Sequence, residues 1–394
     1  MQNAYSIAAH WPHGFDEAGL AAWVTGLRQQ LAGPVSLGLV FTTPPLFAHA
    51  EALLEVLRLH GRIPLLVGCS SNALIAGDQE LESASGLVLG LYVLPGARLA
   101  GVHFTQQQLE AVGEETGWTV ETGVPAGSTN GWLAFVDPFT VDPEGWLRSW
   151  NKAYTSVPTV GGLAVGDPQS QRTQLYLDGR VFEEGGVAVS VGGAIAPLGL
   201  VAQGCTPIGE TWTLTRVEQN LIHQIANRPA FQVLADTVEH LSSEEQQRIR
   251  GNLFIGLATT EYRDEFRRGD FIVRNLIGAD PQSGVLAVAA RPRAGQTVQF
   301  QRRDAAVARE EMRAVLTQAR AGLGDAQIYG GCLCACTGRG RGLFGRASQD
   351  AQMVQRHLGP LGLAGCFCQG EIGPVGGRNF LHSFTAALAL FVGK

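Results

Sequence analysis

The sequence predicts a mixed α/β (α+β) protein of two related halves, built as a layered sandwich with helices outside mixed sheets. Residues 35–69 read as strand, helix and strand, a βαβ-like unit that is typical of α/β folds. Glycine makes up 51 of 394 residues without a collagen period, which favours turns and closely approaching strands over a helical bundle. A small-residue strand end that runs into a polar, acidic loop recurs at 67–82, 160–171 and 364–377, and we interpret this as a duplication.

The first seventy residues contain two amphipathic helices and two buried strands. In 16–31, apolar residues fall at i, i+3, i+4, i+7 and i+11, and a Gly-Pro pair then ends the predicted helix. A continuous apolar strand follows at 35–42. A second helix is predicted around 46–57, and another strand at 63–69.

The middle of the chain changes from alternating strands and helices to antiparallel sheet near residue 159. Asp178-Gly179 stands between two apolar segments and is a strong signal for a β-hairpin. The other predicted elements here are strands at 85–94 and 132–137, weak helix at 106–115 and helix at 143–154.

The pattern changes again after the hairpin region. We expect 215–241 to be mostly helix, interrupted at Arg228-Pro229, because its apolar residues recur at helical spacing. The remaining predicted elements are strands at 253–259, 271–277, 285–290 and 298–301 and a helix around 312–319.

Composition excludes several classes of function. The net charge is −6 and lysine occurs only twice, so no basic surface for nucleic acid is expected. The longest apolar runs are about ten residues, short of the ~20 that span a bilayer, and the N-terminus lacks the pattern of a signal peptide. The cysteine count of seven is odd, which is not typical of a secreted disulfide framework. We therefore expect a cytoplasmic protein with no membrane contact.

Several glycine-rich stretches resemble the FIST family. They are GGLAVGD (161–167), LYLDGRVFEEGGVAVSVGG (175–193), VAQGCTPIGETWTLTRV (201–217), CTGRGRGLFG (336–345) and GEIGPVGGRNFLHSFTAALALF (370–391). The resemblance runs over nearly the whole chain, and we divide the chain accordingly into an N-type domain at 1–215 and a C-type domain at 216–394.

The resemblance implies an intracellular sensor of a small ligand, such as an amino acid. FIST domains occur alone, fused to bacterial signalling modules, or in F-box subunits of ubiquitin ligases. No kinase, chemotaxis, cyclase or F-box segment is visible in this sequence. We therefore expect a separate signalling protein as partner, or a different function.

The first candidate site is a glycine–arginine loop near the C-terminus. Gly340 and Gly342 belong to a literal G-x-G-x-x-G that follows a predicted strand, with Arg339 just before the first glycine and Arg341 between the first two. Such a loop is able to bind the carboxylate or phosphate of a small ligand. A nucleotide is a further alternative, although the second βαβ half of a dinucleotide-binding fold does not follow the loop. A tight turn with solvated arginines is the structural alternative. We expect no cofactor.

The second candidate group lies in GEIGPVGGRN. Glu371 is placed to bind a ligand amine, while an arginine of the preceding loop binds the carboxylate of the same ligand. An internal ion pair between Glu371 and Arg378 is the equally weighted alternative. Asn379 is interpreted as a turn or capping residue, and Asp167 either closes the pocket from the other half or begins a turn.

The third candidate group is formed by cysteines. Alternate residues of a strand share one face, so Cys336 and its two preceding cysteines lie together, as do Cys366 and Cys368. Structural packing, a reactive or ligand-lining thiol and zinc binding are the alternatives, and the spacing is unlike a zinc knuckle, so we expect no metal. Cys336 and Cys368, with Cys205 as a third, are the candidate reactive thiols, and His382 is a candidate base.

Three functions follow from these groups. The first is a protein that binds a small anionic or zwitterionic ligand without turnover. The second is an enzyme in which Cys336 or Cys368 acts as nucleophile and His382 or Glu371 as base. The third is a protein-interaction module with a glycine-rich structural core. We favour the first, and the sequence contains no catalytic constellation of diagnostic spacing.

Overall fold

The computed structural model describes residues 4–112, 117–167, 171–263, 265–266 and 269–394. The chain forms two compact units that are discontinuous in sequence. Unit 1 comprises Met1–Ala202, Met312–Leu381 and Thr385–Lys394, and unit 2 comprises Gln203–Glu311 and His382–Phe384. The predicted boundary after residue 215 falls inside a strand of unit 2, β14 (Cys205–Glu218). The division at 215 therefore stays a prediction about family modules and does not describe the compact units.

Unit 1 contains three six-stranded mixed sheets with one shared plan. In each sheet, two antiparallel strands precede a parallel pair, and a short hairpin then adds to the second strand of that pair. The first sheet is β1 (Ser6–Trp11), β6 (Leu87–Tyr92), β2 (Leu37–Thr42), β3 (Leu66–Ser70), β10 (Leu175–Leu177) and β11 (Arg180–Phe182). The second is β7 (Ala97–Phe104), β12 (Gly186–Gly193), β8 (Gly131–Val136), β9 (Thr159–Leu163), β23 (Glu371–Val375) and β24 (Arg378–His382). The third is β13 (Ile195–Ala202), β25 (Ala386–Gly393), β21 (Ile328–Cys336), β22 (Leu363–Cys368), β4 (Leu74–Ala76) and β5 (Gln79–Leu81).

The three sheets exchange their hairpins in a cycle. The hairpin β4–β5 follows β3 of the first sheet in sequence but pairs with β22 of the third. The hairpin β23–β24 follows β22 and adds to β9 of the second sheet, and β10–β11 follows β9 and pairs with β3 of the first. Each sheet is thereby completed by a distant part of the chain.

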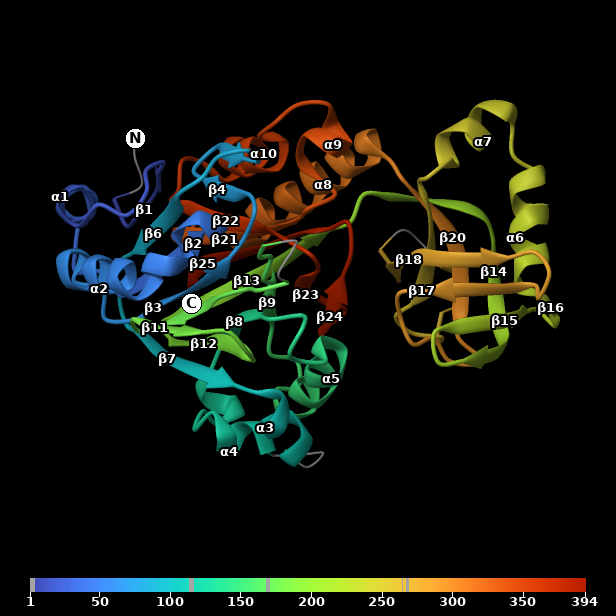
Figure 1. Ribbon diagram of the computed structural model, residues 1–394, viewed down its shortest axis with the longest axis horizontal. Helices are drawn as coiled ribbons and strands as arrows, with labels where there is room; N and C mark the ends of the chain where they lie inside the picture. Colours follow the sequence, from blue (N-terminus) through green and yellow to red (C-terminus); the bar gives the residue numbers. More distant parts are fainter. Residues whose placement is uncertain (1–3, 113–116, 168–170, 264, 267–268) are drawn as a thin grey trace. The chain divides into compact units, whose positions relative to one another are not determined.

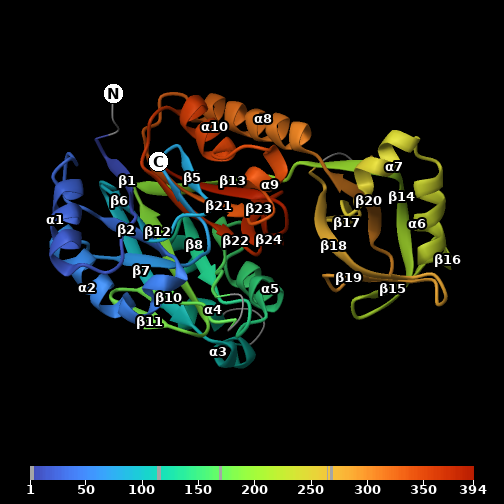
Figure 2. The same cartoon turned by 45° about the horizontal axis from the view of Figure 1, so that its top comes forward.

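One core joins the inner faces of all three sheets, and helices cover their outer faces (Figure 1). The first sheet is covered by α1 (Glu17–Arg28), η1 (Pro44–His49) and α2 (Ala50–Gly61). The second is covered by α3 (Gln106–Ala111), α4 (Gly117–Glu121), η2 (Ala126–Ser128) and α5 (Pro143–Ala153). Figure 2 shows α10 (Gln349–Leu358) beside α8 (Ala305–Leu323), and both contribute to the outer core of the third sheet, with α9 (Gly340–Phe344) before α10.

The predicted fold class is confirmed, because about 28% of the residues are helical, 40% lie in strands, and the helices cover mixed sheets. The number of repeats differs from the prediction. The three echoing segments at 67–82, 160–171 and 364–377 each contain the end of the second parallel strand and the residues after it, once in each sheet. Unit 1 therefore repeats three times, where we expected two halves. Residues 113–116 and 168–170, which belong to the predicted helix at 106–115 and to the second echo, lie outside the described residues.

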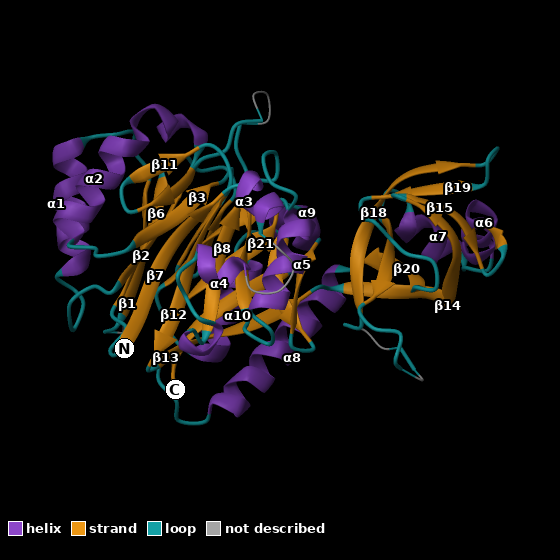
Figure 3. Ribbon diagram, turned by 90° about the horizontal axis from the view of Figure 1, so that it is seen from below, coloured by secondary structure: helices purple, strands orange, loops and turns teal. Residues whose placement is uncertain are grey.

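Unit 2 is an antiparallel barrel in which the first strand pairs with the last. Its strand order is β14, β20 (Thr297–Arg303), β17 (Leu253–Ala258), β18 (Phe271–Asp280), β19 (Val285–Val288) and β15 (Leu221–Ile225), and β15 pairs back to β14 (Figure 3). A two-residue strand, β16 (Arg228–Pro229), and two helices, α6 (Ala230–Glu239) and α7 (Ser243–Ile249), complete the unit.

The prediction of helix over 215–241 is wrong for its first half. The chain turns sharply at Gln219 and again at Ala226-Asn227, where all three residues have positive φ. These turns place Ile222 and Ile225 in a strand whose side chains enter the barrel core. Only α6 is helical. Among the described residues of the whole chain, no helix is long and apolar enough to cross a membrane.

Candidate functional site

The arginine that opens the glycine–arginine loop is held inside unit 1. Arg339 is 1% exposed, its Nε lies 2.6 Å from Oδ2 of Asp350, and its second terminal nitrogen lies 2.8 Å from Oδ1. Two parallel bonds of this kind are the strongest pairing that arginine makes with a carboxylate. The guanidinium also lies over the Phe344 ring, 5.3 Å from its centroid. Arg339 is thus already engaged by protein groups.

A second carboxylate supports this ion pair from the third sheet. Oε1 of Glu80 on β5 accepts hydrogen bonds from the backbone N–H groups of Asp350 (2.8 Å) and Ala351 (2.9 Å), at the first turn of α10. Burial, reinforced by the Asp350 carboxylate, raises the pKa of Glu80 from 4.5 to about 7. Glu80, Asp350 and Arg339 therefore form one buried network of two carboxyl groups and one guanidinium.

The glycine loop itself encloses a carboxylate of the protein. Both oxygens of Glu82 lie 3.0 Å from the backbone nitrogen of Arg341, which donates to them. A Cβ on Gly340 would lie 2.6 Å from the Glu82 carboxyl carbon, and this glycine has φ +59°, so the close approach requires glycine. Arg341 and Gly342 are exposed at the start of α9. The backbone donor expected to bind an anionic ligand is occupied by Glu82.

Glu371 is the first residue of β23, three residues after the end of β22, and is fully buried. Its Oε2 accepts a hydrogen bond of 3.1 Å from the backbone N–H of Thr385, and the Cys336 thiol hydrogen bonds to the same carboxyl group. Burial raises the pKa of Glu371 well above its usual range, more than the Thr385 bond and the charge of Arg339 lower it. The structure therefore brings together Arg339, Glu371 and Cys336 of the predicted set.

The cysteines of the third sheet converge on the inner core. The Sγ atoms of Cys334, Cys366 and Cys368 all lie within 4.8 Å of one another, and all three residues are fully buried. Hydrogen bonds from Cys332, Cys366 and Cys368 lower the pKa of Cys334 well below its usual range. Burial, and hydrogen bonding to Cys334, raise the pKa of Cys366. The predicted sharing of one face is confirmed for Cys332, Cys334, Cys366 and Cys368, whereas the Cys336 thiol bonds to Glu371. Cys368 is fully buried, where partial exposure was expected of a reactive thiol.

The other predicted residues lie apart from this cluster. Asn379 is buried and joins the second sheet to α5: its Oδ1 accepts from the Thr159 N–H (2.8 Å), and its Nδ2 donates to Oδ1 of Asn151 (2.9 Å). Arg378 is exposed, with its guanidinium 5.5 Å from the centroid of the Phe380 ring. These contacts give Asn379 a structural role.

Three further residues complete the predicted set. Asp167, on the loop after β9, forms an isolated backbone bridge with Arg172. Cys205 and His382 belong to unit 2, where Cys205 packs against Phe254 in a small apolar cluster. Both Cys205 and His382 are buried, at 3% and 1% exposed.

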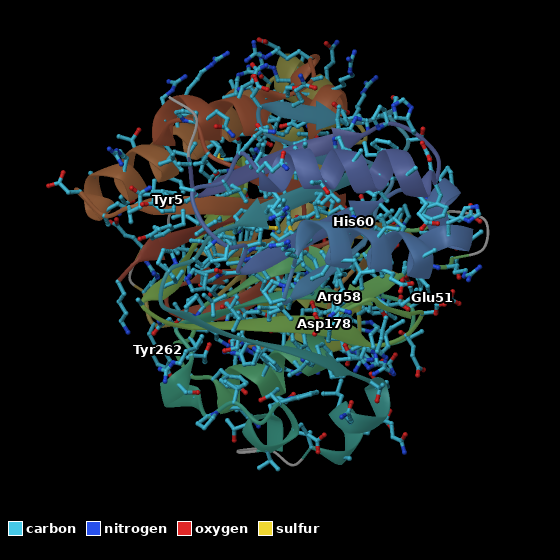
Figure 4. The ribbon with its side chains drawn as sticks, turned by 90° about the vertical axis from the view of Figure 1, so that its left-hand side faces the viewer. Tyr5, Glu51, Arg58, His60, Asp178 and Tyr262 are labelled. Atoms are coloured by element: carbon cyan, nitrogen blue, oxygen red, sulfur yellow. The ribbon has the colours of Figure 1, made fainter. Side chains whose placement is uncertain are left out.

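An open groove of about 1000 Å³ lies between α2 and the β10–β11 turn, a position that the sequence reasoning missed. Three arginines and three acidic residues line it, so its formal charge balances: Arg58, Arg62, Arg180, Glu51, Glu55 and Asp178. Figure 4 shows Arg58 next to Asp178, with Glu51 on the same side of the molecule. Arg58 donates to the Asp178 backbone oxygen at 2.9 Å, while its buried Nε has no hydrogen-bond partner among the described residues. The sequence marked the hairpin turn at 178–179, but nothing in it showed which helix the turn faces.

The groove lies at a position that recurs in all three repeats of unit 1. In each repeat, the helix between the two parallel strands meets a hairpin donated by another repeat. Glu80 fills this position at α10, and the asparagine pair fills it at α5. At α2 the corresponding position holds the open groove. A polar group thus joins helix and hairpin in each repeat, Arg58 being the one at α2, but only there does an open groove of mixed charge remain beside the contact.

Comparisons with known proteins agree over most of the chain. A family model described as FIST N domain matches residues 36–228, and one described as FIST C domain matches 230–374. An uncharacterized protein of Mycobacterium bovis, Mb0898c, is 35% identical over 371 residues, which cover 93% of each chain. The uncharacterized protein Rv0628c of Mycobacterium tuberculosis is 33% identical over 366 residues, covering 93% of this chain and 94% of its own. A solved cyanuric acid hydrolase from A. caulinodans aligns over 99% of both chains at 9% identity and a TM-score of 0.37, a likeness too weak to bear on fold or activity.

Proposed function

The chain belongs to the FIST family, whose domains are small-ligand sensory domains of signalling proteins, and on this premise we propose that it binds a small zwitterionic molecule in the groove beside α2. A free α-amino acid is the ligand class that fits this description. The observation that supports the proposal is the balanced set of three guanidinium and three carboxylate groups around one open groove. A ligand with both an amine and a carboxylate finds partners for both ends there.

Arg58 also has donors beyond its bond to the hairpin. One terminal nitrogen donates to the Asp178 backbone oxygen, and a guanidinium carries five N–H donors. Arg58 is therefore able to hold the hairpin and bind a ligand carboxylate as a second partner. The groove is framed by α2 and the β10–β11 turn of the first sheet, and sites on such rigid elements hold ligands with more precision than flexible loops.

The glycine–arginine loop is the alternative position for the same ligand. Arg341 and Arg378 are exposed there, whereas Arg339 is engaged by Asp350 and the backbone donor of Arg341 by Glu82. We favour the groove because binding at the loop would first have to displace these internal carboxylates.

The proposal also includes a reducing compartment and a separate signalling protein as partner. None of the seven cysteines, all within the described residues, forms a disulfide, which agrees with a reducing compartment such as the cytoplasm. A separate signalling protein would then read the bound state.

Thermal unfolding with single free amino acids at millimolar concentration tests the proposal. A ligand present at a hundred times its Kd should stabilise the protein by about 2.7 kcal/mol. We expect at least one amino acid to raise the unfolding temperature of the wild type and of Arg341→Ala, and to leave Arg180→Ala unchanged.

Arg180→Ala and Arg341→Ala are matched, because each removes an exposed arginine. Loss of the ligand effect in Arg341→Ala, with retention in Arg180→Ala, would move the site to the glycine–arginine loop. No stabilisation of the wild type by any of the amino acids would refute the ligand class.

A further inference from the structure

The thiol cluster on the inner face of the third sheet is not used by the proposed function. Its centre is the triangle of Cys334, Cys366 and Cys368, whose Sγ atoms all lie within 4.8 Å of one another. The Sγ atoms of Cys366 and Cys368 are 3.7 Å apart. None of the three residues is exposed to solvent.

The strand register produces this triangle. Cys334 on β21 lies directly opposite Cys366 on β22 in the parallel pair, and Cys368 is two residues farther along β22 on the same face. Gly162 of β9 faces the cluster from the second sheet, because a Cβ at this position would lie 2.3 Å from Sγ of Cys368. The cluster therefore lies where the sheets meet, on rigid backbone.

Two more thiols adjoin the triangle. Cys332 hydrogen bonds to Cys334 from the same strand, and Cys69 at the end of β3 hydrogen bonds to Cys366 from the first sheet. Five cysteines, contributed by three strands, thus gather in a core whose other members are apolar.

The spacing of the triangle suits a metal ion. A thiolate sulfur lies about 2.3 Å from Zn²⁺, and three such sulfurs are about 4.0 Å apart when they surround the ion in one plane, or about 3.8 Å apart in a tetrahedral site. The 3.7 Å and the 4.8 Å limit observed here bracket these values, so the side chains need to move by less than about 1 Å. A disulfide requires sulfurs about 2.05 Å apart, a much larger movement.

The sequence spacing led us to expect no metal, but on this geometry we propose that Cys334, Cys366 and Cys368 bind one thiophilic d¹⁰ metal ion, Cu(I) or Zn(II), at the junction of the sheets. Soft thiolate ligands select these ions. The triangle alone supplies the three ligands of a trigonal Cu(I) site, whereas tetrahedral Zn(II) would take Cys69 or Cys332 as its fourth ligand.

Charge and burial support this assignment. Three thiolates in an apolar core repel one another and lose their hydration, and a bound cation offsets both effects. Binding releases the thiol protons, so loading should be weaker at low pH. Because the sulfurs are buried, the ion enters as the protein folds and leaves slowly.

The test is the metal content of the whole protein, expressed with added zinc or copper and purified under reducing conditions. We expect one ion per chain by native mass spectrometry and elemental analysis, in the wild type and in Cys205→Ser. Cys205 is a matched control, since it is buried but belongs to unit 2. In Cys334→Ser the content should fall at least tenfold.

X-ray absorption at the metal edge keeps the proposal testable if Cys334→Ser does not fold. The edge energy identifies the element, and we expect three sulfur neighbours for Cu(I) or four at about 2.3 Å for Zn(II). Wild-type protein without metal after growth with either ion, a disulfide among the five cysteines in place of the ion, or metal lost from Cys205→Ser but retained in Cys334→Ser would each overturn the site.

Discussion

Glu80→Gln tests whether the ionised Glu80 carboxylate destabilises the folded protein at neutral pH, through the buried network beside α10. Glu80 is 5% exposed, and burial together with Asp350 raises its pKa from 4.5 to about 7. The folded protein therefore keeps a proton on Glu80 that the unfolded chain has already released. The contribution of Glu80 to stability is complete below about pH 4.5 and is lost as the pH rises through about 7.

The size of this effect follows from the two pKa values. The difference corresponds to about 3 kcal/mol at ~1.36 kcal/mol per pKa unit. Most of this is lost between pH 5 and pH 8, so the free energy of unfolding of the wild type should fall by roughly 2–3 kcal/mol over that range through Glu80 alone. Glutamine keeps an oxygen for the N–H groups of Asp350 and Ala351 and cannot ionise. Glu80→Gln should therefore be more stable than the wild type at pH 8 by a similar amount.

Urea unfolding at pH 5 and pH 8, followed by tryptophan fluorescence, measures this difference. Six of the seven tryptophans, all except Trp212, lie in unit 1, so the signal reports mainly on that unit. Glu82→Gln is the control, because it replaces the carboxylate that accepts a hydrogen bond from the α9 backbone by a weaker acceptor. It should lower the free energy of unfolding at pH 8 by up to about 1 kcal/mol, whereas Glu80→Gln should raise it. If Glu80→Gln and the wild type lose the same stability between pH 5 and pH 8, the reasoning is refuted.

Three further predictions concern packing and backbone conformation. Asn379→Ala should lower the free energy of unfolding by about 2–4 kcal/mol in urea titrations, because it leaves several buried partners on and near α5 without a hydrogen bond, and a loss below about 0.5 kcal/mol would contradict this. Gly162→Ala should lower the unfolding temperature sharply, because its Cβ would lie 2.3 Å from Cys368 Sγ. Gly127→Ala is the control and should have little effect, because its Cβ would meet nothing within 4 Å. Equal effects of the two substitutions would show that the sheet junction is not tightly packed. Arg62→Gly should raise the free energy of unfolding by up to about 1 kcal/mol, because Arg62 ends α2 with φ 49°, and destabilisation would indicate that its side-chain contacts outweigh the backbone strain.

Local patterns in the sequence predicted most individual elements. The apolar face at 16–31 became α1, the run at 35–42 contains β2, the run at 63–69 contains all but the last residue of β3, and Asp178-Gly179 turns a hairpin. The strand spacing of the cysteines also placed them on one face. These features depend on neighbours a few residues away, which sequence periodicity reports directly.

The arrangement of these elements depends on long-range pairing, which periodicity does not report. The three echoes were visible, but a cyclic exchange of hairpins leaves no local signal, so three repeats were interpreted as two halves. The partners of Arg339 and of the glycine loop were missed for the same reason: Asp350 stands on a later helix, and Glu82 lies some 260 residues earlier in the chain. Helical spacing at 215–225 was misleading because two turns with positive φ override it.

The exchanged hairpins also determine how synthesis and folding are coupled in time. Ser71, just before β4, donates a hydrogen bond to the Phe367 backbone oxygen across 296 residues of sequence. At about 5–20 residues per second, a ribosome needs roughly 15–60 s to make the partner after the donor has emerged. Throughout that interval the hairpin β4–β5 has no partner, because β22 does not yet exist. A third of unit 1 that is cut out or moved therefore loses the hairpin that completes its sheet and keeps one that has no partner.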